Sequence, residues 1–171
     1  MSLESMHDLM LEELQDLYNA EQQLTKALPK MVEKTSHPVL REALESHLRE
    51  TENQVVRLEQ IFRDLDQKPG GRKCKGMEGL IDEGNELLSE AGSEAVRDAG
   101  IIAAAQRVEH YEIAAYGCAV TFAELLGKRE IATLLKQTLE EEKAADEKLT
   151  QIAEQEVNSN ALSAAGAGRT H

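Results

Sequence analysis

The sequence predicts an all-α protein, a bundle of four long helices arranged as two hairpins. Three observations predict this fold class. Ala, Leu, Glu, Gln and Lys make up most of the 171 residues, with only 3 Pro and no Trp. Apolar residues recur at steps of three and four over very long stretches. The chain also repeats its own pattern once, which indicates two equivalent halves.

The helices can be bounded by their apolar stripes and by the sequences that interrupt them. Thr35 to Pro38, Lys68 to Gly71 and Gly127 are turn-forming breaks. We expect long helices from about Leu3 to Lys34, Pro38 to Asp66, Ser93 to Leu126 and Lys128 to Val157. A shorter helix, Met77 to Ala91, is expected to lie across the bundle within a long crossover. Residues 1–157 then form one domain, and the Ala, Gly, Ser and Asn-rich tail 158–171 is expected to be disordered.

The repeat appears when the first helical pair is shifted by 91 positions onto the second. Leu44 then meets Leu135, Glu21 meets Glu112 and Glu50 meets Glu141. Two amphipathic hairpins could share leucines by coincidence, but the matching glutamates favour duplication. Two hairpins joined by a long crossover have the topology of a ferritin-like four-helix bundle.

Composition excludes several classes of function. The formal net charge of -13 disfavours nucleic acid and anionic lipid as partners. No apolar run approaches the roughly 20 residues that span a bilayer, and the N-terminus lacks the features of a secretory signal. Two cysteines build neither a disulfide framework nor a zinc site, although Cys74 lies in a basic segment that could lower its pKa. We expect a soluble cytoplasmic protein.

The candidate site is indicated by acids inside the apolar stripes. Glu21 lies between Leu17 and Leu24, and Glu112 lies in the middle of the third long helix's stripe. The stripe of the fourth long helix carries Glu142 and Asp146. An ionised carboxylate away from water costs several kcal/mol unless a positive charge compensates it. None of these three stripes holds a Lys or Arg, so a shared cation is the economical compensation.

Two further pairs offer ligands at i, i+3 spacing, which points both side chains the same way. They are His47 with Glu50 and Glu109 with Glu112. Oxygen-rich ligands with one imidazole suit Fe(II) or Mn(II). The candidate ligands for two such ions are Glu21, His47, Glu50, Glu109, Glu112, Glu142 and Asp146, of which some would only orient the others.

Readings without a metal compete with this one. The glutamates could reach past the edge of the core, and Arg57 could pair with Glu50. The repeat favours Glu141 as the partner of Glu50, whereas the apolar stripe favours Glu142.

Several segments, above all Val-Glu-His-Tyr-Glu at 108–112, resemble the YciE/YciF family of bacterial ferritin-like stress proteins. The others are Ala20 to Leu24, His47 to Thr51, Met77 to Ile81 and Leu139 to Lys143. The resemblance covers roughly residues 3–157, and it implies a homodimer of helical bundles, a di-metal centre and expression under stress. One departure concerns the Glu-x-x-His pairs of the wider di-iron bundles. Glu50 and Glu142 are followed three residues later by Asn53 and Ala145, so metal identity and oxygen chemistry stay open.

Two functions from different classes follow. The first is a stress-associated metal protein whose two Fe or Mn ions act on peroxide, dioxygen or Fe(II). The second is a structural or partner-binding stress protein without catalytic activity. Iron storage in a hollow shell is weakened by the expected tail and by the resemblance to dimers. No catalytic residue can be assigned from the sequence.

Overall fold

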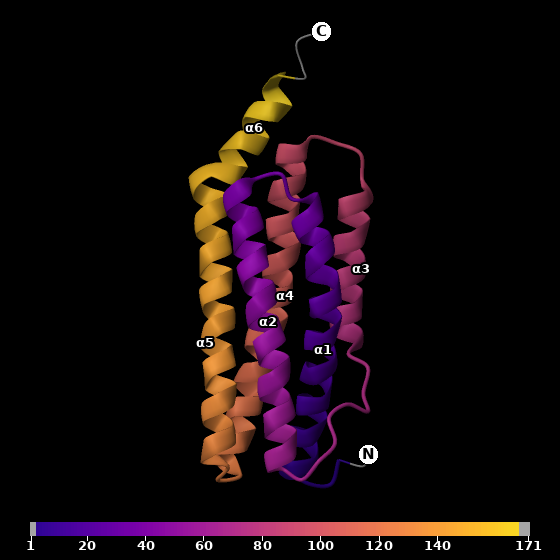
Figure 1. Cartoon of the computed structure of the whole chain (residues 1–171), viewed down its shortest axis with the longest axis vertical. Helices are drawn as coiled ribbons and strands as arrows, with labels where there is room; N and C mark the ends of the chain where they lie inside the picture. The colour runs from indigo at the N-terminus through magenta and orange to yellow at the C-terminus, as the bar shows by residue number, and fades with distance from the viewer. Residues whose placement is uncertain (1–2, 168–171) are drawn as a thin grey trace.

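The computed structural model describes residues 3–167 and, within them, a bundle of four long helices (Figure 1). Their bounds are α1 Met6–Lys34, α2 Pro38–Asp64, α4 Glu94–Leu125 and α5 Arg129–Ile152. No strand occurs in this range. The all-α class and the four long helices are confirmed, with ends that lie within a few residues of the expected positions, apart from the end of α5.

The topology is that of two antiparallel hairpins. α1 and α2 form one hairpin and α4 and α5 the other, and residues 65–93 run the length of the bundle between them (Figure 1). This crossover carries α3, Lys75–Ser89. The expectation that this helix lies across the bundle is wrong, because α3 lies lengthwise against α1 and α4, where Met77 is fully buried.

Local chemistry fixes the ends of the helices. At the start of α1 the hydroxyl of Ser5 accepts a hydrogen bond of 3.1 Å from the N–H of Asp8. Pro38 begins α2 with the backbone angle that a first helical turn requires. Gly127 follows α4 with a φ of +70°, a conformation that glycine adopts without strain.

The C-terminal segment differs from the expected disordered tail. A five-residue π-helix, Ala153–Val157, follows α5, and α6 continues as Asn158–Ala167. α6 contacts α4, and its alanines favour helix once a neighbouring surface is present. Residues 168–171 of the predicted tail lie outside the described residues. No helix in the described part is both long and apolar enough to cross a bilayer.

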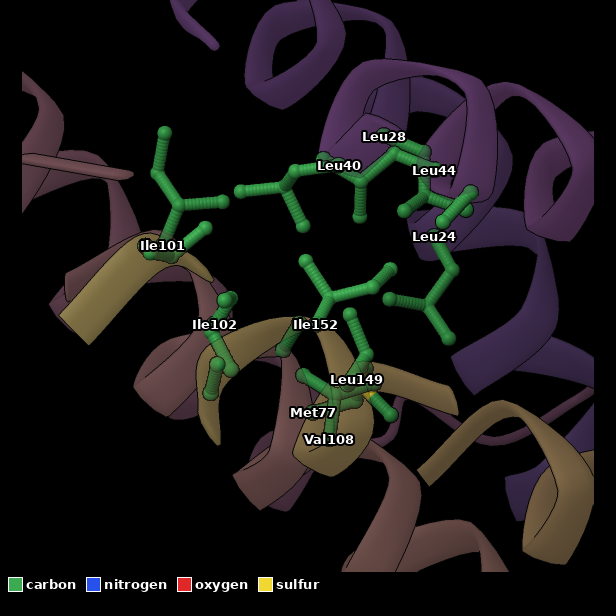
Figure 2. Close-up of a cluster of buried hydrophobic side chains, with 14 of the residues drawn as sticks. Leu24, Leu28, Leu40, Leu44, Met77, Ile101, Ile102, Val108, Leu149 and Ile152 are labelled. Carbon is green, nitrogen blue, oxygen red and sulfur yellow. The ribbon is translucent and has the colours of Figure 1, made fainter. Parts of the chain in front are cut away.

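The core consists of two apolar clusters at opposite ends of the bundle. The first cluster, shown in Figure 2, includes Leu24, Leu40, Ile101 and Leu149. The second cluster includes Leu14, Phe62, Val120 and Leu135. Each long helix contributes to both clusters, and the buried residues between them on the same helices are mostly polar. The fold therefore places a layer of buried polar residues between two apolar ends. We call it the polar layer, and its charged or titratable members are Glu21, His47, Glu109, Glu112 and Glu142.

The turn between α1 and α2 is tied to α4 by Asp98. Its carboxylate is 3% exposed and accepts hydrogen bonds of 2.9 Å from the backbone N–H groups of Ser36 and His37. Asp98→Ala should lower the free energy of unfolding by about 2–3 kcal/mol, because two backbone N–H groups lose a buried, charged acceptor. Urea denaturation would measure this. The exposed Asp82→Ala is the control, and equal stability of the two variants would contradict the assignment.

Candidate metal centre

The polar layer brings five titratable side chains into the middle of the bundle. Glu21 comes from α1, His47 from α2, Glu109 and Glu112 from α4, and Glu142 from α5. All four carboxylates are at most 1% exposed, and His47 is 6% exposed. Each lies on its helix between residues of the two apolar clusters, so the packing of the bundle ends forces these side chains inward.

Four of these residues converge on one point. His47, Glu109, Glu112 and Glu142 each place one ligand atom within 4.8 Å of the other three. The imidazole Nε2 of His47 lies 3.1 Å from a carboxylate oxygen of Glu109. Glu21 adjoins this group: in addition to the effect of burial, its charge raises the pKa of Glu112, and the charge of Glu109 in turn raises the pKa of Glu21. Three helices thus supply ligand atoms at mutual distances that a metal ion can bridge.

The carboxylate oxygens of this layer are poorly satisfied by the protein itself. Both oxygens of Glu112 and Glu142, and one oxygen each of Glu21 and Glu109, have no hydrogen-bond partner in the structure. Within the described residues, no Lys or Arg nitrogen lies within 4.0 Å of these four carboxylates. Buried polar atoms are nearly always paired. Six carboxylate oxygens without a hydrogen-bond partner, beside one imidazole, form a ligand set that fits a hard or borderline divalent cation.

The electrostatics of the layer show the cost of leaving it without a cation. Burial raises the pKa of Glu21 to about 7, even though the Tyr116 hydroxyl donates a hydrogen bond to its carboxylate. Burial and the neighbouring carboxylates raise the pKa values of Glu112 and Glu142 well above the ordinary range. Burial alone would lower the pKa of His47, but the charge of Glu109 raises it well above 6.5. Without a cation, these groups retain protons near neutral pH.

The other two candidate ligands lie outside the group of four. The side chain of Glu50 is 45% exposed, and its carboxylate is 3.8 Å from Nδ1 of His47. Asp146 accepts a hydrogen bond of 3.1 Å from the side-chain amide of Gln106 and lies 3.2 Å from Nε2 of His110, whose side chain is exposed.

Of the two neighbouring acids Glu141 and Glu142, the structure places Glu142 in the polar layer. Glu142 points into the layer, whereas Glu141 binds Arg57 through contacts of 2.8 and 2.9 Å. Arg57 therefore pairs with Glu141 and not, as the alternative without a metal had it, with Glu50. The repeat misled here because it aligns Glu142 with Thr51, which is equally buried but carries no charge.

Some features of the site were not predicted from the sequence. Tyr116 on α4 is fully buried, and its hydroxyl donates a hydrogen bond to the carboxylate of Glu21. The lowered pKa considered for Cys74 is wrong. Its thiol is buried and 2.9 Å from the Tyr111 hydroxyl, and burial raises its pKa. No spacing rule identifies a hydroxyl partner on another helix; only the buried position of Tyr116, four residues after Glu112, was a signal.

The family of this chain follows from its similarity to known proteins. A family model described as a domain of unknown function, DUF892, matches residues 5–162. The chain belongs to the DUF892 family. A relative in this comparison is the Escherichia coli (strain K12) protein YciF, 48% identical over 162 residues that cover 94% of this chain and 98% of YciF. The predicted resemblance to the YciE/YciF family is thereby confirmed.

Solved structures support the same fold. The crystal structure of the E. coli stress protein YciF matches with a TM-score of 0.87 and 49% identity, covering 91% of this chain and 98% of that one. YcfI from Rhodopseudomonas palustris matches with a TM-score of 0.85 and 49% identity, covering 87% and 95%. A Xanthomonas campestris protein, 22% identical with a TM-score of 0.74 and coverage of 91% and 96%, shares the fold. The helical bundle of this chain is thus shared with these three solved structures.

The raised pKa values predict how the stability of metal-free protein depends on pH. Glu21, Glu112 and Glu142 bind their protons more tightly in the folded state, so stability falls as pH rises above about 4.5 and continues to fall through the folded pKa values. His47, raised in the same way, loses its contribution at higher pH still. We expect the melting temperature of metal-free protein to drop between pH 5 and pH 8.

The variant Glu112→Gln tests directly whether the buried carboxyls cause this pH dependence of stability. A neutral amide at this position avoids the cost of either protonating or burying the carboxylate, so it should stabilise the metal-free protein at pH 8 by about 1–4 kcal/mol and flatten its pH profile. Exposed Glu52→Gln is the matched control. A wild-type profile that stays flat, or that rises with pH, would contradict the assigned pKa shifts.

Proposed function

We propose that this protein is a metal-handling or redox stress protein that binds two divalent ions, Fe or Mn, in the polar layer. One observation carries the proposal: four ligand-bearing side chains from three helices converge within 4.8 Å, and most of their oxygens lack any protein partner. Two divalent ions would balance the charge of the four buried carboxylates, whereas a protonated His47 alone would not.

The residues fall into three roles in this proposal. Ligands to the ions come from the polar layer: Glu21, His47, Glu109, Glu112 and Glu142. Glu50 is exposed enough to turn either to solvent or toward the ion beside His47. Asp146 supports the site by holding Gln106 and His110, which flank Glu109 on α4.

The chemistry of the site is that of a buried redox metal centre. Bound Fe or Mn would supply electron exchange with peroxide, dioxygen or Fe(II). The chain's own residues would hold the ions, orient them and exclude bulk water. We place this activity in the cytoplasm of a stressed bacterium, because the chain is related to a protein described as a stress protein. The homodimer is what the resemblance to the YciE/YciF family implies. The chain carries a charge of -13. That charge disfavours a role on nucleic acid or membranes.

The adjacent residues Glu141 and Glu142 of α5 allow a matched test of metal binding. Metal content should be measured by elemental analysis on protein purified without chelators and then incubated with Fe(II) or Mn(II) under anaerobic conditions. We expect about two ions per wild-type chain and a higher melting temperature with metal than without it. Glu142→Gln should lose at least one ion and most of the metal-dependent stabilisation.

Glu141→Gln is the matched control, because it removes the adjacent carboxylate, which binds Arg57 outside the layer. It should keep its metal content while losing some stability in both metal-free and metal-bound forms. Wild-type protein that binds neither ion, with an unchanged melting curve, would overturn the proposal and favour the structural or partner-binding alternative.

A further inference from the structure

A cavity between α2 and α5 leads from the surface to one edge of the polar layer. It encloses about 180 Å³, and two site residues, His47 and Glu109, lie along it. Glu21, Glu112 and Glu142, which are fully buried, do not line it. The exposure of His47, greater than that of the four carboxylates, agrees with this position. The contact between His47 and Glu109 therefore lies between the cavity and the deeper carboxylates.

The cavity exists because small side chains line it on both helices. α2 contributes Ala43 and Ser46, and α5 contributes Ala144 and Ala145. Larger residues at these positions would fill the space between the helices. Pockets for drug-sized organic ligands usually span about 300–1,000 Å³. A cavity of about 180 Å³ is below that range, so it admits ions and small molecules, at most about the size of benzene.

The charged groups along the cavity differ in how firmly they are held. Glu141 is held by Arg57, whereas Glu50 is exposed and lies 3.8 Å from Nδ1 of His47. Lys148 is an exposed basic residue on the same cavity. An exposed carboxylate next to the His47 imidazole is suited to receiving a cation from solvent and passing it inward.

We propose that the α2–α5 cavity is the entrance to the metal centre. It restricts the substrate class to ions and small molecules, peroxide and dioxygen among them, with Glu50 as the carboxylate that first receives an incoming cation. The inference rests on the proposed function, since an entrance needs a site behind it. It goes beyond that function by excluding drug-sized and larger organic substrates that must reach the metal through this opening.

The test compares the rates and the extent of metal binding in variants that block the cavity. Ala144→Phe and Ala145→Leu place bulk on its α5 wall, and Ala114→Leu, at an exposed position on α4, is the control. Metal-free protein is mixed with Mn(II), uptake is followed by the loss of the free Mn(II) electron paramagnetic resonance signal, and release is followed after adding a chelator.

We expect both uptake and release to slow by about tenfold or more in the blocking variants, with an unchanged final metal content. An obstructed route raises the barrier in both directions without changing affinity, and tenfold corresponds to about 1.4 kcal/mol in the barrier. Damage to the site itself would instead lower the final content. Unchanged rates in both variants, with normal wild-type binding, would overturn the entrance and leave the proposed function intact. Wild-type protein that binds no Mn(II) or Fe(II) would overturn both.

The role of Glu50 has its own test in the same experiment. Glu50→Gln should slow Mn(II) uptake several-fold at low ionic strength, and salt should reduce the difference, because the attraction of an exposed carboxylate is screened. Glu52→Gln, an exposed acid on the same helix, is the matched control. Equal slowing in the two variants would show that the overall negative surface charge attracts the ion, and it would overturn the specific role of Glu50.

Discussion

The cost of burying four carboxylates beside one imidazole is the constraint on which the rest of this structure depends. Glu21, Glu109, Glu112 and Glu142 lie in one buried layer, with at most one positive charge, that of His47, among them. Proteins avoid such arrangements unless the charge is neutralised by protons or by a cation. The raised pKa values describe the first solution, and the free oxygen atoms of the layer fit the second.

The two apolar clusters stabilise the fold that contains these buried acids, and they fix how the four long helices face one another. Leucine and isoleucine side chains at both ends of the bundle fix the rotation of each long helix, and that rotation directs the acids between them inward. The lengthwise crossover and α3 cover one side of α1 and α4. On the opposite side, small residues of α2 and α5 leave an opening that reaches His47. Packing thus determines both where the charge is buried and from where it can be approached.

Much of this could be predicted from the sequence because helical periodicity reports directly on burial. The apolar stripes predicted the four long helices and placed Glu21, Glu112 and Glu142 in the core, and the structure places them there. Contacts between helices could not be predicted in the same way. The hydroxyl of Tyr116 on Glu21, the pairing of Arg57 with Glu141 and the exposure of Glu50 depend on which rotamers meet across the bundle. The helix α6 formed where composition predicted disorder, because a neighbouring helix supports it.

Anomalous X-ray diffraction from crystals of the protein grown with Mn(II) tests the central claim most directly, because it locates the ions as well as detecting them. The account predicts strong anomalous peaks inside the polar layer, at about 2.0–2.3 Å from oxygens of Glu112 and Glu142 and near Nε2 of His47. Peaks confined to the acidic surface, with the layer empty and its carboxylates protonated, would contradict it.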